Sequence, residues 1–137
     1  MKYLLNIVIT LLFVMGMALA EDKPAEKRFV ATIDKDGYQR MEMTAGEYYF
    51  DPAVVVVKVN VPVELSIKKV GGITPHNFVV KAPEADLDFS LDLSSEAKRV
   101  SFMATKVGSY PFECSNQFLF FKSHKERGMH GVLEVVE

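Results

Sequence analysis

Apolar and polar residues alternate with a period of two along most of the chain from Phe29 onward. Such alternation is typical of β-strands with one buried face, because successive side chains of a strand point to opposite faces. A helix is disfavoured in the branched run 54–59, where β-branched side chains would lose rotamer freedom in a helical turn. The pattern predicts about eight short strands, at residues 29–33, 38–43, 54–59, 63–67, 76–81, 99–103, 110–114 and 132–136.

Turn residues separate the predicted strands. We expect a turn at Asp36 and Gly37 and a break at residues 60–62. Residues 48–52 follow as a bend, in which Pro52 confines its position to a sheet edge or a corner. Short strands joined by turns, without an amphipathic helix, indicate an all-β fold, a sandwich of two antiparallel sheets.

Residues 82–93 are acidic and only weakly patterned. Their aspartates suggest a calcium loop, but the segment has neither the loop glycine nor the closing glutamate at the required spacing. We therefore expect a solvated connection between two strands.

Composition indicates one ordinary globular domain. Of 137 residues, 49% are hydrophobic and 11% are aromatic, which is enough to form a core. With 16 basic and 18 acidic residues the net charge is −2, which neither requires a nucleic-acid partner nor indicates a disordered acidic tail. No internal repeat or long linker divides the chain, so the predicted domain covers residues 29–137.

The N-terminus has the pattern of a secretory signal peptide. One lysine precedes an apolar run over residues 4–19, and an A-x-A sequence ends at Ala20 before the chain becomes charged. Residues 1–20 are interpreted as a cleaved signal peptide and residues 21–28 as a flexible leader. If the segment were retained, it would be close to the length needed for a membrane anchor. The predicted location is periplasmic or secreted.

Cys114 is the only cysteine of the chain. In an oxidising compartment it lacks an intramolecular disulfide partner and is open to oxidation unless it is buried or bound to a metal. A buried apolar cysteine is the simplest interpretation of a single cysteine. Here the histidines and the methionine that follow within a short segment favour metal binding.

The predicted topology can bring these side chains together. Cys114 points to the same face as two core aromatic residues at alternate positions before it, so its sulfur is directed inward. The loop that follows must fold back to enter the last strand, which places Cys114, His124 and Met129 near one another. His76 stands at the start of another predicted strand, where a rigid ligand is expected.

Thiolate, imidazole and thioether form the ligand set that selects copper. We predict that His76, Cys114 and His124 bind one copper ion. Met129 would complete the set. Zinc accepts one cysteine and two histidines, but it would leave the methionine unused.

The motifs around these residues resemble those of the cupredoxins, the small blue copper proteins. The resemblance covers residues 29–136 and rests on Pro75-His76-Asn77-Phe78, Gly108-x-Tyr110-x-Phe112-x-Cys114 and His124-x4-Met129-x-Gly131. It implies a Greek-key sandwich with a mononuclear type 1 copper. His76, Cys114 and His124 would lie in a plane around the ion. Met129 would be the axial ligand, and Asn77 would tie the two ligand loops together by hydrogen bonds.

One feature departs from the simple plastocyanin-like members. Nine residues separate Cys114 from His124, a spacing more similar to that of the type 1 domain of copper nitrite reductases. The long loop leaves the last ligand open, because His130 could replace the neighbouring Met129 and give a more nitrogen-rich site. The binuclear domain of cytochrome oxidase subunit II is also similar, but it needs two cysteines.

The insertion itself contains an apolar run at residues 118–121. We predict that part of this run packs over the site as a lid that belongs to the core, and the alternative is a docking patch. Beyond it lies a rim that is mostly basic and is expected to steer an acidic redox partner. The rim consists of Lys122, Lys125, Glu126 and Arg127.

The function predicted from these features is one-electron transfer by a monomeric protein that is not an enzyme. Catalysis at copper would need an open coordination position or a second metal, and three histidines are too few. One alternative is copper handling as a chaperone or sensor, for which Met41 and Met43 would add soft ligands. Another is an accessory domain similar to oxidase subunit II.

Overall fold

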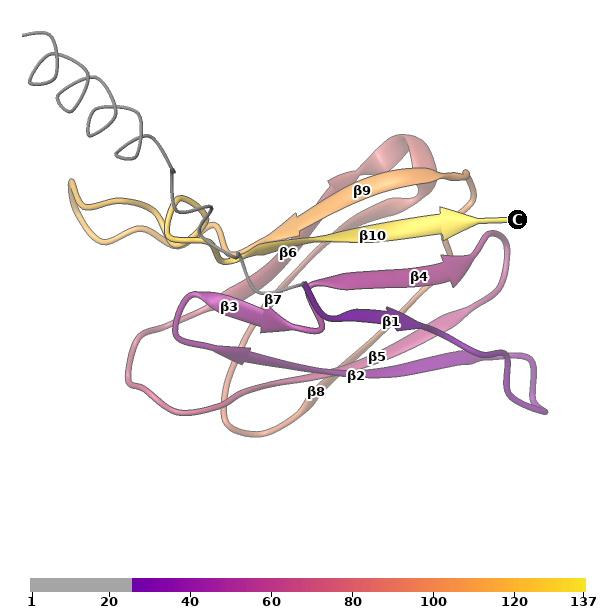
Figure 1. The fold of residues 1–137 in the computed structure, drawn as a ribbon, viewed down its shortest axis with the longest axis horizontal. Coiled ribbons are helices and arrows are strands. Elements are labelled where there is room, and N and C mark those ends of the chain that lie inside the picture. Colours follow the sequence, from indigo (N-terminus) through magenta and orange to yellow (C-terminus); the bar gives the residue numbers. More distant parts are fainter. Residues whose placement is uncertain (1–25) are drawn as a thin grey trace, which may run out of the picture.

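The computed structural model describes residues 26–137, which form two β-sheets packed face to face (Figure 1). The predicted signal peptide and most of the predicted leader lie outside the described residues. A short 3-10 helix, η1 (Pro83–Ala85), follows β6. The strands are β1 (Arg28–Val30), β2 (Gln39–Gly46), β3 (Tyr49–Asp51), β4 (Val54–Lys58), β5 (Val63–Lys69), β6 (Asn77–Ala82), β7 (Leu87–Asp92), β8 (Lys98–Phe102), β9 (Gly108–Glu113) and β10 (His130–Val136).

One sheet has the strand order β1-β4-β10-β9-β6-β7 and the other has β3-β2-β5-β8. This arrangement confirms the predicted all-β sandwich. The pairing is mixed, because β4 runs parallel to both β1 and β10, and β2 runs parallel to β5. The expectation of purely antiparallel sheets is therefore wrong. Alternation along a strand identifies its buried face, but it carries no information on the direction of the neighbouring strand.

The predicted bend at residues 48–52 is in part a strand. β3 pairs antiparallel with β2 and forms the edge of the four-stranded sheet. Its edge position agrees with the restriction expected from Pro52, which follows directly. Three residues are too few for a periodic pattern to be recognised in the sequence.

The acidic segment 82–93 was expected to be a solvated connection, and this is wrong as well. It contains β7, an edge strand of the six-stranded sheet, paired with β6 along its whole length. Leu87, Phe89 and Leu91 alternate with polar residues, and the polar positions are exposed. The period of two is present in the sequence. The acids mask it because they occupy the solvent face, where charged side chains also protect an edge strand from further pairing.

The core lies between the two sheets and includes an aromatic cluster near the end that carries His76 and Cys114. The rings of Phe50, Phe78 and Phe112 have centroid separations of 5.0 to 5.5 Å. Phe78 and Phe112 each stand two positions from a predicted ligand, so the cluster supports both ligands from the core side. Aromatic pairs of this kind contribute about 0.5–1.5 kcal/mol each beyond the burial of their area.

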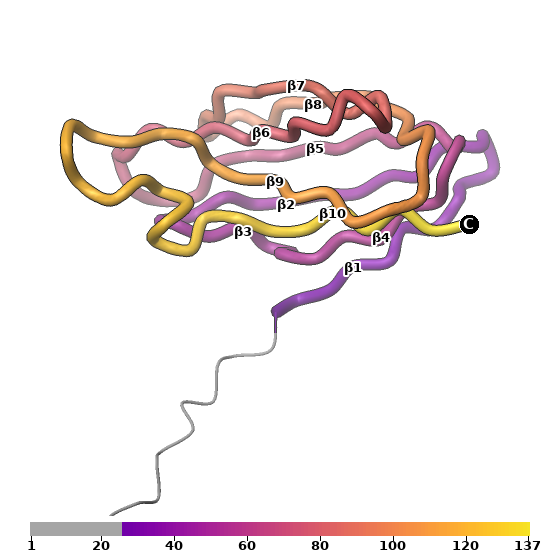
Figure 2. The backbone as a smooth tube through the Cα atoms, turned by 90° about the horizontal axis from the view of Figure 1, so that it is seen from above, coloured from indigo at the N-terminus to yellow at the C-terminus, as the bar shows by residue number. Residues whose placement is uncertain are grey.

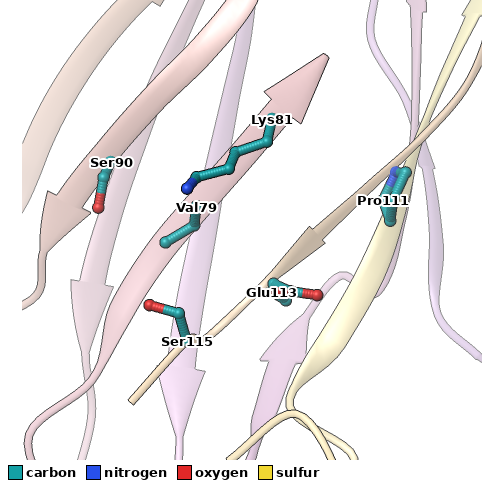
Figure 3. A pocket seen from close by; sticks show the side chains of 6 residues that line it. All are labelled: Val79, Lys81, Ser90, Pro111, Glu113 and Ser115. Atoms are coloured by element: carbon teal, nitrogen blue, oxygen red, sulfur yellow. The ribbon is translucent and has the colours of Figure 1, made fainter.

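A shallow hollow occurs on the outer face of the six-stranded sheet (Figure 3). It lies on the opposite face of β9 from the buried side chains of Tyr110 and Phe112. Its lining residues are Val79, Lys81, Ser90, Pro111, Glu113 and Ser115. Within residues 26–137, no helix is long and apolar enough to cross a membrane.

Candidate metal centre

Cys114 directly follows β9, whose alternation directs Tyr110 and Phe112 into the core. The same alternation directs the thiol inward, and Cys114 is fully buried. Its backbone N–H donates to the carbonyl oxygen of Met129 at 3.0 Å, which continues the β9–β10 pairing by one residue into the loop. The sulfur is thus held by the rigid end of the sheet.

His76 directly precedes β6 and is 2% exposed. Its carbonyl oxygen accepts a hydrogen bond from the backbone N–H of Leu93 at 2.9 Å, immediately after β7. The imidazole therefore extends from the end of a paired strand, as the sequence predicted.

His124 is 5% exposed and belongs to the loop between β9 and β10. Its backbone N–H donates to the carbonyl of Asn116 at 2.9 Å, and its own carbonyl accepts from the backbone N–H of Met129 at 3.0 Å. These bonds fold the loop back onto its own start. The predicted convergence of Cys114 and His124 is confirmed.

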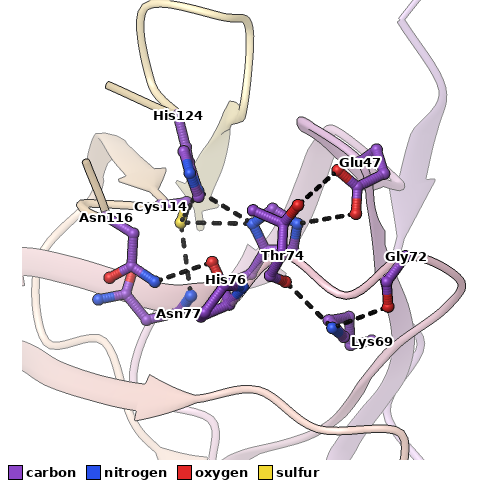
Figure 4. A network of polar contacts seen from close by, with 10 residues as sticks. Glu47, Lys69, Gly72, Thr74, His76, Asn77, Cys114, Asn116 and His124 are labelled. Carbon is purple, nitrogen blue, oxygen red and sulfur yellow. Dashed lines mark hydrogen bonds and ion pairs between the residues drawn. The ribbon is translucent and has the colours of Figure 1, made fainter. Parts of the chain in front are cut away.

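The three side chains meet at one end of the sandwich (Figure 4). The Nδ1 atoms of His76 and His124 lie 3.0 Å apart. The Sγ atom of Cys114 lies 3.9 Å from the first nitrogen and 3.3 Å from the second. Two imidazole nitrogens and one thiol sulfur therefore face each other inside the protein, and they form a group that can hold a metal ion.

The separations fit a single small ion. Metal–nitrogen bonds of about 2.0–2.1 Å and metal–sulfur bonds of about 2.3 Å place the ligand atoms of one ion roughly 3.0 to 3.8 Å apart. The three separations in the structure, 3.0, 3.3 and 3.9 Å, span almost the same range. Since the donors include a thiol and two imidazoles, with a buried methionine beside them, the set fits one copper ion.

Met129 and His130 differ in where their side chains lie. Met129 is fully buried, and its backbone binds both Cys114 and His124. His130 is exposed at the start of β10 and does not belong to the group formed by the thiol and the other two histidines. The alternation of β10, continued back by one residue, thus directs the methionine inward and His130 toward solvent.

Asn77 joins the two ligand segments, as the resemblance implied. Its side chain accepts a hydrogen bond from the backbone N–H of Ser115 at 2.8 Å and donates one to the Ser115 hydroxyl at 2.9 Å. Its backbone N–H also points to the Cys114 sulfur at 3.4 Å. One residue therefore fixes the spacing of two strand ends and donates a hydrogen bond to the sulfur.

Glu47 was not predicted to be part of the site. One carboxylate oxygen lies 3.8 Å from Nε2 of His76, a buried nitrogen without a hydrogen bond. The other oxygen accepts from the Thr74 hydroxyl at 3.0 Å, which orients the carboxylate (Figure 4). A Cβ atom at Gly72 would stand only 1.8 Å from this carboxylate, and Gly72 has a φ of +61°, so glycine is favoured there.

Tyr48 also packs against the two imidazoles, and no motif in the sequence predicted this. It has a φ of 64°, and its ring meets the rings of His76 and His124 edge to face, with centroids 5.9 and 5.1 Å apart. The guanidinium of Arg127 lies 4.7 Å from the centre of the Tyr48 ring. None of these contacts of Tyr48 could be expected from the sequence, because the partners are far apart along the chain.

The environment favours the neutral form of both imidazoles by lowering the pKa of each. Burial lowers the pKa of His76, and the nearby His124 lowers it further, although the charge of Glu47 opposes the shift. Burial also lowers the pKa of His124, and the positive charge of Arg127 adds to this effect. Neutral imidazole is the form that binds metals, so the site favours metal binding at neutral pH.

A pH dependence of stability follows from these shifts. Between the lowered pKa values and the ordinary imidazole value of about 6.5, the unfolded chain binds protons that the folded chain does not. The free energy of unfolding of the metal-free protein should therefore fall as the pH drops below about 7, by at most about 1.4 kcal/mol per pH unit for each histidine. Urea unfolding between pH 7.5 and about 5.5 measures this, and His124→Gln should reduce the slope. An identical slope in the variant would contradict the assignment.

The apolar run 118–121 does not form the predicted lid. Its four side chains are 48% to 87% exposed and stand outside the core. The predicted basic rim exists only in part as free charge, because Lys125 binds Glu113 at 2.5 Å and Arg127 packs on Tyr48. The lid was expected because an apolar loop usually gains stability by burial. The structure instead exposes it.

The fold is similar to those of solved copper proteins. The metal-binding domain of CopA, the Cu(I)-exporting P-type ATPase of Streptococcus pneumoniae, matches with a TM-score of 0.60 at 18% identity, over 82% of this chain and 98% of that one. Dithionite-reduced auracyanin of Roseiflexus castenholzii matches with a TM-score of 0.59 at 16% identity, over 78% and 99% of the two chains. This is the cupredoxin fold.

A third similar structure is the periplasmic domain of cytochrome oxidase subunit II from Bradyrhizobium japonicum. Its TM-score is 0.53 at 19% identity, over 77% of this chain and 88% of that one. No protein-family model and no curated relative matches the chain. The cupredoxin fold is therefore recognised here through structure and through the buried cluster, whereas overall sequence similarity is low.

Proposed function

We propose that the protein is a periplasmic or secreted electron carrier with a mononuclear type 1 copper site. His76, Cys114 and His124 would be the main ligands and Met129 the axial ligand. The observation that carries the proposal is the convergence of one thiol and two imidazole nitrogens in a buried site, with separations that suit a single ion. Copper supplies the one-electron Cu(II)/Cu(I) change in such a site.

The surrounding residues suit electron transfer because they restrict movement. Cys114 and His76 extend from strand ends, and Asn77 fixes the distance between these ends. His124 is held by backbone hydrogen bonds on both sides. A ligand set that cannot rearrange keeps the reorganisation small when an electron enters or leaves, and burial keeps water from the ligands.

An electron could reach the site through His124. A surface cavity is bordered on one side by the loop before β6 and on the other by the loop after Cys114. His124 is one of its lining residues, although it is only 5% exposed. The lining comprises Ile73, Thr74, Pro75, Asn116, Gln117, Phe118 and His124. We therefore expect a redox partner to approach from this end of the sandwich.

The proposal is tested by loading the mature chain with copper and recording visible absorption, paramagnetic resonance and a voltammogram. A type 1 site gives an intense thiolate-to-copper band toward the red end of the visible spectrum and a reversible one-electron wave. A stable but colourless and redox-silent copper complex would refute electron transfer while leaving metal binding intact.

Copper handling is the competing function, and the neighbour from a Cu(I) exporter belongs to that class. Met41 and Met43, the proposed additional soft ligands, are 4% and 2% exposed and lie in the interior of β2 within the core. Delivery to another protein would require ligands that can be reached from outside. Rapid loss of Cu(I) to a competing chelator, together with the absence of a stable Cu(II) form, would favour handling over electron transfer.

Glu47 offers a test of the proposed ligand role of His76. When Nδ1 binds a metal, the imidazole proton must sit on Nε2, and the negative charge of the Glu47 carboxylate at 3.8 Å favours it there. Glu47→Gln removes the negative charge and should weaken Cu(II) binding about tenfold. Competition with a chelator measures this, with Glu42→Gln, an exposed acid on the same chain segment, as the matched control. Equal affinities in the two variants would contradict the role.

A further inference from the structure

The outermost part of the loop between β9 and β10 is apolar. We call its four residues, Phe118, Leu119, Phe120 and Phe121, the aromatic tip; their exposed fractions are 67%, 70%, 87% and 48%. Figures 1 and 2 show this loop extending beyond the end of the sandwich. Large apolar side chains exposed together are unfavourable in water, so the aromatic tip suits an apolar environment outside the protein.

The aromatic tip is ordered by its own contacts. The ring of Phe121 stacks on Phe118 at 6.1 Å and on Phe120 at 5.0 Å, with interplanar angles of 15° and 26°. The backbone N–H of Phe121 donates to the carbonyl of Phe118 at 3.1 Å, and the Gln117 amide donates to the carbonyl of Phe121 at 2.8 Å. These internal hydrogen bonds lower the cost of moving the turn out of water.

Positive charge lies directly behind the aromatic tip. Between residues 117 and 128, Lys122, Lys125 and Arg127 outnumber the single acid Glu126, whereas acids are in excess over the chain as a whole. The carboxylate of Glu126 accepts hydrogen bonds from the backbone N–H of Ser123 at 2.8 Å and from its hydroxyl at 2.9 Å. Lys125 also pairs with Glu113 of β9, so the loop together with this partner keeps one positive charge in excess.

We propose that the aromatic tip inserts into the interface of an anionic lipid bilayer, with Lys122 and Arg127 at the head groups while Lys125 stays paired with Glu113. Such a bilayer offers a negative surface directly above an apolar layer, which complements a basic rim below an apolar tip. A stable protein partner usually buries about 800 Å² on each side. Four side chains at the end of a narrow loop suit insertion better than the coverage of a broad surface.

Insertion would also orient the proposed copper site. Phe118 and His124 line the same surface cavity, so the ligand end of the sandwich would face the membrane. This consequence rests on the proposed function, because it concerns the approach of membrane-bound redox partners. The membrane contact itself requires no metal.

Vesicle flotation tests the proposal with the mature chain expected after signal cleavage, residues 21–137, in metal-free and copper-loaded form. The vesicles contain phosphatidylglycerol and phosphatidylethanolamine, or phosphatidylcholine alone. We expect binding to the anionic vesicles with either form of the protein, weaker binding at high salt and much weaker binding to phosphatidylcholine. Because metal-free protein is included, failure of the copper proposal would not affect this result.

The variants separate insertion from general stickiness. Leu119→Ser combined with Phe120→Ser removes the outer half of the aromatic tip and should lower vesicle affinity at least about tenfold. Val107→Ser is the matched control, since Val107 is 46% exposed at the opposite end of β9 and should have no effect. Lys122→Gln should lower affinity about fivefold. Phe118, which lines the same cavity as His124, stays unchanged in every variant. The metal site should therefore remain intact, and the copper spectrum of each variant checks this.

Two results would overturn the proposal. One is that the wild-type protein does not float with anionic vesicles. The other is that the double variant and the Val107→Ser control float equally well. If an acidic redox protein binds the aromatic tip and the vesicles do not, the loop is instead a protein-docking element.

Discussion

Cys114→Ser should abolish the thiolate-to-copper absorption of the copper-loaded protein while the sandwich remains folded. The sulfur is fully buried and accepts a hydrogen bond from the backbone N–H of Asn77. A serine hydroxyl can accept the same bond, so the expected loss of stability is only about 1–3 kcal/mol. A hydroxyl is a hard, weakly acidic ligand and cannot replace a thiolate at copper. Absorption spectra and thermal unfolding of the two proteins measure both effects.

The histidines provide the matched control for this experiment. His124→Gln removes a buried nitrogen of the site and should also eliminate the spectrum, whereas His130→Gln changes an exposed side chain and should leave it unchanged. Since Cys114 is the only cysteine, any thiolate band must come from it. An intense band that survives Cys114→Ser, or one that disappears in His130→Gln, would show that the ligand assignment is wrong.

Asn77→Ala should produce the second large effect. The substitution removes the two side-chain hydrogen bonds to Ser115 and leaves the Ser115 backbone N–H without its partner. We expect a loss of about 1–3 kcal/mol in the free energy of unfolding and a loss of roughly 10- to 100-fold in copper affinity. Urea unfolding and competition with a chelator measure the two quantities.

Asn116→Ala serves as the control for Asn77→Ala. Asn116 also joins the two ligand segments, but by a single, exposed hydrogen bond from its side chain to the carbonyl of Pro75. Its removal should cost less stability and change copper affinity little. If the two variants behave alike, the spacing of the strand ends does not depend on Asn77.

Local periodicity explains what could be predicted of the fold and the site. The alternation before Cys114 placed its sulfur on the buried face, and the obligatory return of the chain into β10 brought His124 near it. A single cysteine in a chain whose N-terminus resembles a signal peptide then indicated that Cys114 is a metal ligand. Each of these arguments needs only neighbouring residues and the closure of a loop.

Contacts between distant segments explain what could not be predicted. Glu47 and Tyr48 reach the imidazoles from the β2–β3 turn, a segment that no motif connects to the site. β7 was missed because its outward acids hid the alternation of Leu87, Phe89 and Leu91. The lid at residues 118–121 was predicted from hydrophobicity alone, which does not distinguish a side chain buried in its own core from one that another surface would cover.

The closure of the ligand loop has a consequence for how this protein can diversify. The hydrogen bonds from Cys114 to Met129 and from His124 to Asn116 hold the base of the loop, so residues 117–123 form a separate excursion. Their length and chemistry can be exchanged without shifting the donor atoms. For the proposed electron carrier, a polar segment grafted at these positions should leave the copper spectrum and the reduction potential unchanged and alter only which surface the loop contacts. Partner recognition and the potential could then be engineered independently.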